Sequence, residues 1–171
     1  GQSRSEPFDV AILDARAGMH DIGAAAVTRL GAHAFLFARN DPQTWIAYQQ
    51  LFEHLRYSPS VEYGMPDHDL RWRLSTVGAM VGGTEQDFED LRGRSFSTWL
   101  WLYDEEEQPT PGTPDETDQD MPHYPLCVFA VEELRNASFH DPDASPAPSV
   151  LERAYANFFE MANSRLLGPG E

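Results

Sequence analysis

The sequence predicts an α/β fold of three layers, in which helices cover both faces of a mainly parallel sheet of about four strands. Short apolar runs alternate along the chain with segments whose apolar residues recur every three or four positions. Each pair of runs is separated by enough residues for a crossover helix, which parallel neighbours require. The 171 residues are sufficient for one domain of this kind.

Composition restricts the possible partners. The chain carries 28 Asp and Glu against 12 Lys and Arg, a formal net charge of -16, which disfavours direct contact with nucleic acid or an anionic membrane surface. All twelve cations are Arg, so no lysine of this chain can bind a phosphate or form a Schiff base. A lone Cys127 and the absence of a leader or a long apolar run predict a cytoplasmic protein with no membrane span.

The chain opens with residues 1–7, which are small, polar and unpatterned and predict a disordered lead-in to a single domain over residues 8–171. Residues 8–14 then form a short apolar run that ends in Asp14, typical of a strand buried on both faces. The Ala-rich residues 22–30, followed by Gly31, predict a helix.

A second strand and helix follow. Residues 32–38 form another apolar run, and Asp41 with Pro42 is a favourable start for a helix over residues 43–56. The apolar residues of that helix fall on one stripe, which predicts core contacts with a sheet: Trp45, Tyr48, Leu51, Phe52 and Leu55. The second half of residues 70–81 predicts a third strand.

Residues 84–103 predict a further helix, since Thr84 and Asp87 have the spacing of a capping box. Its expected buried side is aromatic: Phe88, Phe96, Trp99 and Trp101. Residues 104–120 contain eight carboxylates, three prolines and no aliphatic residue, which predicts a mobile acidic insertion.

The chain ends with a fourth apolar run and a last amphipathic helix. Residues 125–131 predict the fourth strand, and Ser149 is expected to cap the helix that follows a loop over residues 136–148. The apolar face of that helix consists of Val150, Ala154, Phe158, Met161 and Leu166.

Ligands of parallel sheets bind beyond the carboxyl ends of the strands, so the residues after each predicted strand are candidates for a site. These are residues 14–21, 39–41, 82–84 and 132–133. The first segment is the most informative, because a carboxylate at Asp14 can hold the water shell of a magnesium ion, and Gly18 lets the backbone approach a phosphate.

Residues 8–18, with the sequence FDVAILDARAG, resemble the Walker B and switch segment of the MinD/ParA (CobQ/CobB/MinD/ParA) class of P-loop ATPases. In that class a buried strand ends in Asp-x-Pro-x-Gly or Asp-Ser-Pro-Ala-Gly. The order of elements is similar over the whole chain. Bacterial members with an Asp-x-Arg-Ala-Gly loop and a later Pro-His-x-Pro-Leu run, like residues 122–126 here, are the most similar.

The resemblance implies a complete protein that binds and hydrolyses ATP with magnesium and acts as a nucleotide-dependent switch. Asp14 would orient magnesium-bound water, and Gly18 would sense the terminal phosphate. Arg16 and Asp21 would relay the nucleotide state. These two residues and the Asn40–Asp41 turn would lie at the nucleotide.

The chain departs from the family pattern in ways that bear on activity. The lysine-bearing phosphate-binding loop lies upstream of this segment in the family, so the chain resembles the carboxyl-terminal portion and is expected to be inactive alone. An adenine-reading Asn is replaced by Gly82–Gly83, and an Ile-Pro pair by Ala130–Val131.

The family's strand order has a further consequence. The strand before the phosphate loop would lie between residues 8–14 and residues 33–37. An unfilled slot would leave backbone groups unpaired at about 1–3 kcal/mol each when buried, so no open slot is expected. The two strands would close up, or the missing amino-terminal half or a second copy of the chain, giving a homodimer, would fill it.

A different class of function competes with this one: a catalytically silent α/β domain that binds a protein through its acidic surface or an aromatic helix. Asp14 is then a strand terminator or helix cap. His123 is expected to be a turn residue whose ring is satisfied by the backbone. Zinc is not expected at His20–Asp21 or at residues 67–69, which lack a second cluster at ligand spacing.

Two further kinds of chemistry are disfavoured. A hydrolase triad lacks a Gly-x-Ser-x-Gly elbow, and Ser75 lies within a predicted strand. Cys127 falls in the middle of a buried strand, where a thiol behaves as a small hydrophobic group.

Overall fold

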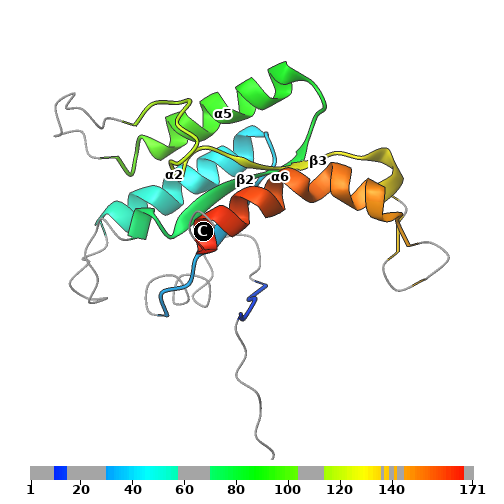
Figure 1. Ribbon diagram of the computed structural model, residues 1–171. Helices are drawn as coiled ribbons and strands as arrows, with labels where there is room; N and C mark the ends of the chain where they lie inside the picture. Colours follow the sequence, from blue (N-terminus) through cyan, green and yellow to red (C-terminus); the bar gives the residue numbers. More distant parts are fainter. Residues whose placement is uncertain are drawn as a thin grey trace, which may run out of the picture.

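The computed structural model describes residues 10–14, 30–57, 70–103, 114–135, 137–138, 141 and 145–167. Within these residues the fold is α/β, and its centre is a parallel sheet in the order β1-β2-β3 (Figure 1). The strands are β1 (Ala34–Ala38), β2 (Leu74–Val81) and β3 (Leu126–Phe129). The central strand β2 pairs with both neighbours.

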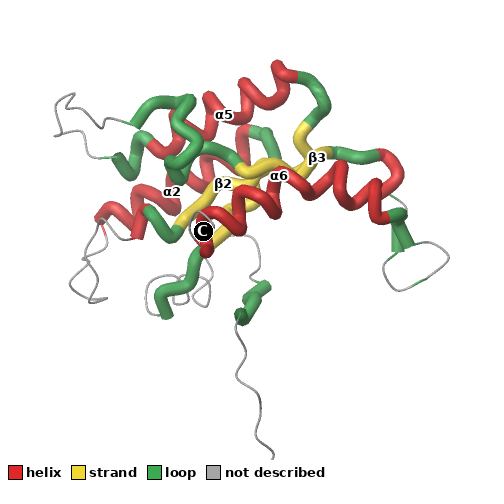
Figure 2. Tube along the Cα trace, viewed as in Figure 1, coloured by secondary structure: helices red, strands yellow, loops and turns green. Residues whose placement is uncertain are grey.

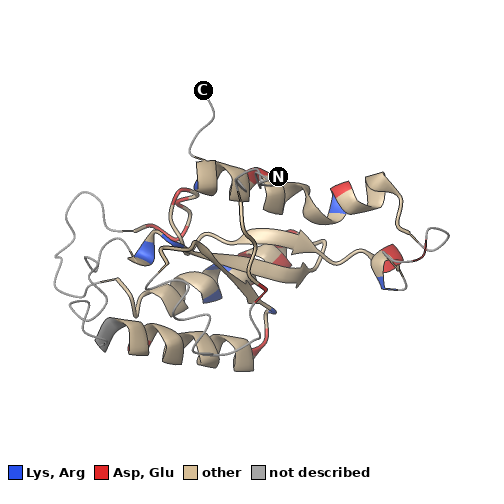
Figure 3. Ribbon diagram, turned by 90° about the horizontal axis from the view of Figure 1, so that it is seen from below, with Lys and Arg blue, Asp and Glu red and all other residues tan. Residues whose placement is uncertain are grey.

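Helices cover the two faces of this sheet. The crossover helices α2 (Pro42–Tyr57) and α5 (Glu85–Trp99) connect β1 to β2 and β2 to β3. Both crossovers run in the same direction across the sheet. Because crossovers of this kind share one handedness, both helices lie on the same face. After the short 3-10 helix η1 (Glu132–Leu134), helix α6 (Pro148–Leu167) covers the other face, and Figure 3 shows the sheet between α6 and the opposite layer.

Two parts of the core reflect these two faces. Residues of α2 and α5 pack on one face of the sheet with Leu74, Val81 and Cys127, and their buried members are Trp45, Phe52, Leu91 and Trp99. On the other face Ala162 of α6 packs with Val77 and Leu126, and the half-buried Phe35, Phe158 and Met161 surround them.

Most of the expected elements are confirmed. The predicted stripe on α2, the second to fourth strands and the capping box of α5 are all present. Ser149 does not cap α6, because the helix already begins at Pro148, a residue suited to the first turn. Trp101 is 45% exposed because it lies in the turn beyond the end of α5, and Leu166 is 50% exposed.

The first predicted strand is the main difference. Its described part, residues 10–14, forms no strand, and the sheet has three strands rather than four. The side chains of Val10, Ile12 and Leu13 are 71%, 91% and 61% exposed. Among the described residues no strand lies beside them to accept and donate backbone hydrogen bonds, which an extended segment needs if it is to join a buried sheet.

Several other predictions fall outside the described residues. They concern the lead-in over residues 1–7 and the helix over residues 22–30, of which only Leu30 is described. Of the acidic segment, the structure describes residues 114–120, which precede β3. Figure 2 shows the loop that leads from Pro114 past α5 into β3.

Candidate functional site

The candidate site from sequence is the edge at the carboxyl ends of the strands. The structure brings Arg39, Asn40 and Asp41 to this edge after β1, and residues 82–84 after β2. Asp14 is described and exposed, but no strand places it at the edge. Arg16, Gly18 and Asp21 lie outside the described residues.

Asn40 and Asp41 make local contacts that begin α2. The Thr44 backbone N–H donates to Oδ1 of Asp41 at 2.9 Å, and the Thr44 hydroxyl donates to Oδ2 at 3.2 Å. The backbone hydrogen bond from Thr44 lowers the pKa of Asp41 from its ordinary value. The indole Nε1 of Trp45 donates to Oδ1 of Asn40 at 3.0 Å. The side-chain oxygens of both residues are therefore already engaged in starting the helix.

The turn after β2 is shaped by the start of α5. The Thr84 hydroxyl lies 2.6 Å from Oδ2 of Asp87, and the Asp87 backbone N–H donates to that hydroxyl oxygen at 3.1 Å. A Cβ atom at Gly82 would lie 2.1 Å from the same Oδ2, so a larger residue here would displace the capping carboxylate. The Asn of the resembled family would do so as well.

The backbone just before this turn is irregular. Met80 has a φ of 59°, a left-handed conformation that is uncommon for a residue other than glycine. The pairing of β2 with β3 shifts between Ala79 and Val81, as in a β-bulge. The bulge reorients the chain at the carboxyl end of the central strand.

The carboxylates that follow β3 are paired at the surface. Glu133 accepts from Nη2 of Arg153 at 2.5 Å, which lowers the pKa of Glu133. Both side chains are more than half exposed, so solvent screens the pair. Among the described residues, no group of three His, Cys, Asp or Glu side chains could hold a metal ion.

A buried polar cluster lies instead at the opposite edge of the sheet, where β2 and β3 begin. We define it as Thr76, Ser95, Trp99, Tyr103 and His123, all at most 8% exposed. The Trp99 indole donates to Oγ1 of Thr76 at 2.7 Å. The Ser95 hydroxyl lies 2.6 Å from the His123 carbonyl and 3.1 Å from Oγ1 of Thr76. With one proton each, Ser95 donates to the carbonyl and accepts from Thr76.

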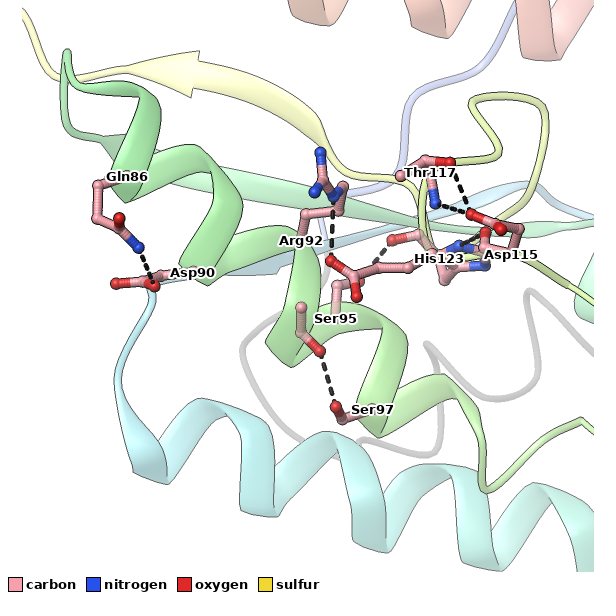
Figure 4. Close-up of polar contacts among 10 residues, drawn as sticks. Gln86, Asp90, Arg92, Ser95, Ser97, Asp115, Thr117 and His123 are labelled. Carbon is pink, nitrogen blue, oxygen red and sulfur yellow. Dashed lines mark hydrogen bonds and ion pairs between the residues drawn. The ribbon is translucent and has the colours of Figure 1, made fainter.

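The geometry fixes the tautomer of His123 (Figure 4). Its Nε2 lies 3.0 Å from the carbonyl oxygen of Asp115, which can only accept, so Nε2 carries the proton. Nδ1 then accepts from the Tyr103 hydroxyl at 2.7 Å. Burial lowers the pKa of His123, which keeps the ring neutral. The expected satisfaction of the ring by the backbone is confirmed at Nε2.

His123 cannot act on a substrate from this position. Its side chain is 0% exposed and both ring nitrogens are bonded. It precedes β3 and therefore lies at the amino edge of the sheet, away from the carboxyl edge where ligands of parallel sheets bind. The cluster instead fastens the loop before β3 to α5. No local sequence pattern reveals it, because the residues that hydrogen-bond to one another lie 19 to 28 positions apart.

The same loop is held by two arginines. Arg92 of α5 pairs with Glu116 at 3.2 Å. Arg165 of α6 donates through Nη2 to three backbone carbonyls, those of Tyr124 at 2.8 Å, Met121 at 3.1 Å and Gln119 at 3.5 Å. The loop is thus tied to both faces of the fold.

An exposed aromatic surface adjoins β1 on the side of α6. It consists of Phe37, Tyr155, Phe158 and Phe159, whose neighbouring ring centroids lie 5.4 to 6.1 Å apart. Phe37 is 54% exposed and Phe159 is 58% exposed. The outer edge of β1 beside this surface pairs with no strand among the described residues.

Comparison with known proteins identifies no relative: no family model, no curated protein and no solved structure matches the chain. Among the described helices, none is long and apolar enough to cross a membrane.

Proposed function

We propose that the chain is the Walker B and switch portion of a MinD/ParA-like ATP-binding and hydrolysing protein, a nucleotide-dependent switch when complete and inactive as this chain alone. Two observations support it most: the outer edge of β1 pairs with no strand among the described residues, and the apolar residues 10–14 are exposed and form no strand.

One absent strand accounts for both features. In the resembled family, the strand before the phosphate-binding loop lies between the Walker B strand and the strand that corresponds to β1. Such a strand would give the outer edge of β1 its backbone partners and would give residues 8–14 a neighbour to pair with. Parallel sheets are normally buried on both faces. Because β1 is as apolar as a central strand, it too needs to be covered.

The aromatic surface supports the same arrangement. The described half of the sheet progresses from β1 toward β3 with its crossover helices on the face of α2 and α5. A doubly wound sheet starts in the middle and progresses the other way in its second half, so the helices of that half fall on the opposite face. A helix there would cover Phe37 and Phe159.

The site residues take the following roles in this proposal. Asp14 orients magnesium-bound water, which suits an ion that keeps several waters and takes its other ligands from phosphates. Gly18 senses the terminal phosphate, and Arg16 and Asp21 relay the change to the switch loop. Asn40 and Asp41 act indirectly, because their side-chain oxygens position the start of α2 at the nucleotide edge.

The experiment compares this chain with a longer chain translated from the coding sequence upstream of Gly1. We expect calorimetry with ATP and magnesium to show no binding by the present chain, and binding and turnover by a longer chain with a lysine-bearing glycine loop. Asp14→Asn should abolish turnover and leave the fold intact, whereas Glu152→Gln, at an exposed residue of α6, should leave turnover unchanged. An upstream sequence without such a loop, or a longer chain that binds no ATP, would overturn the proposal.

The exposed aromatic surface also favours the second candidate, a catalytically silent domain that binds a protein. A second copy of the chain is the simplest such partner, because two β1 edges can pair. Sedimentation would then give a dimer that Phe37→Glu dissociates, while Leu167→Glu, which alters a residue already 80% exposed, leaves it unchanged. This candidate holds only if the longer chain fails to bind ATP.

A further inference from the structure

A cavity of about 500 Å³ lies at the amino edge of the sheet, where β2 begins. Its buried floor includes Leu74, Ser75 and Pro122, and Arg165 of α6 lines it as well. Since ligands of the nucleotide-binding folds occupy the carboxyl edge, this cavity is separate from the proposed ATP site. Its volume is within the range of small-molecule sites, about 300–1,000 Å³.

Arg165 is a largely buried cation of this cavity without a direct counter-ion among the described residues. One guanidinium nitrogen, Nη2, bonds three carbonyls, but Nη1 is buried and has no hydrogen-bond partner. Among the described residues no carboxylate lies within salt-bridge distance of it. Burial lowers its pKa to about 10. A buried charge without a counter-ion is unfavourable, so an anion beside this group would be stabilised.

The charges of the cavity have a definite order. The buried part of the lining also includes Ser75, which is 1% exposed and whose hydroxyl lies 2.9 Å from Nε2 of His33. The exposed residues at the mouth include the carboxylates of Asp120 and Glu160 and the indole of Trp72, which is 54% exposed. A ligand that enters far enough to meet Arg165 therefore passes two negative groups.

We propose that this cavity binds a small zwitterion of the amino-acid class, with its carboxylate at Arg165 and Ser75 and its ammonium group at Asp120 and Glu160. A simple anion would satisfy Arg165 but would be repelled at the mouth. An amine would be held at the mouth but would leave Arg165 unpaired. Binding turns the guanidinium so that Nη1 faces the cavity. The contact given up is the longest of its three carbonyl contacts, that to Gln119 at 3.5 Å.

The test is a titration of the whole chain with a series of ω-amino acids of increasing length, followed through the indole N–H resonance of Trp72. The matched controls are the alkyl carboxylate and the alkyl amine of each length. We expect saturable shifts, a length optimum, and binding of the best zwitterion about tenfold or more tighter than either control, the loss typical of one charge-assisted contact.

Variants locate the two ends of the ligand. Arg165→Lys should weaken binding of both the zwitterion and the carboxylate. Because this change could also loosen the loop before β3, Glu160→Gln provides a second variant, since Glu160 is exposed. It should weaken binding of the zwitterion and not of the plain carboxylate, whereas Glu152→Gln, exposed on α6 outside the cavity, should change neither.

Two results would overturn the proposal: no saturable shift up to about 100 mM of any zwitterion, or equal affinity for zwitterion and plain carboxylate. Neither result depends on ATP, so the failure of this inference and that of the proposed function are distinguishable.

Discussion

Removing the hydroxyl of Tyr103 should destabilise the fold through one lost hydrogen bond. Tyr103→Phe takes the donor from Nδ1 of His123, which lies 2.7 Å away and is fully buried. The ring of Tyr103 is retained, so little packing is lost. Tyr103 is itself only 8% exposed, which limits the access of water to the vacated position. An unsatisfied buried acceptor costs about 1–3 kcal/mol, and we expect a loss of about 2 kcal/mol in the free energy of unfolding.

Urea denaturation at pH 7.5, followed by far-UV circular dichroism, measures this loss as a lower midpoint with an unchanged slope. Tyr155→Phe is the matched control. The Tyr155 ring packs beside Phe159 on α6, and its hydroxyl makes no hydrogen bond to another described residue. Tyr155→Phe should therefore change the free energy of unfolding by no more than about 0.5 kcal/mol. Equal losses for the two variants would show that the buried hydrogen bond to His123 does not stabilise the fold.

Three further perturbations follow from the same structure. The free energy of unfolding should be highest above about pH 6.5, the pKa of a His in the unfolded chain, and should fall as the pH drops below it. Burial lowers the pKa of His123 and His33 in the folded protein, so the unfolded chain takes up protons first. Urea midpoints measured between pH 7.5 and pH 5 check this. Gly82→Ala should lower the thermal midpoint by displacing the Asp87 carboxylate, with a loss of about 1 kcal/mol typical of a helix cap. Leu91→Ala, at a side chain 1% exposed, should cost about 2–5 kcal/mol in chemical denaturation, and a loss within the range of surface variants would contradict its place in the core.

The sequence was informative where local rules decide the structure. The stripe on α2 and the Thr84–Asp87 capping box depend on residues three or four positions apart, and both are present. The three strands that formed are apolar runs with a neighbouring strand. Residues 10–14 form a similar apolar run without such a neighbour, and a run of this kind indicates only that a segment can be buried. Whether it becomes a strand depends on hydrogen bonds from another part of the chain.

The polar residues were harder to interpret than the apolar ones. Asp41 was singled out both as a helix start and as a nucleotide contact, and the structure supports the first through its hydrogen bond to Thr44. The polar cluster around His123 was not found, because no periodicity relates Thr76, Ser95 and Tyr103 to it. The one available indication was composition: Thr76 lies inside the otherwise apolar strand β2, where a polar side chain needs a partner.

The two edges of the sheet differ in how far their contacts reach, which has a consequence for motion. At the amino edge, hydrogen bonds of Tyr103, Ser95 and Arg165 join residues 20 to 46 positions apart and tie α5, α6 and the loop before β3 together. At the carboxyl edge, the contacts of Asn40, Asp41 and Thr84 span three to five residues. Contacts confined to one turn can rearrange without separating the helices from the sheet, whereas the amino-edge contacts are lost together only when the layers open. A conformational response of the backbone is therefore expected at the carboxyl edge and along the unpaired side of β1, while the backbone at the amino edge stays fixed.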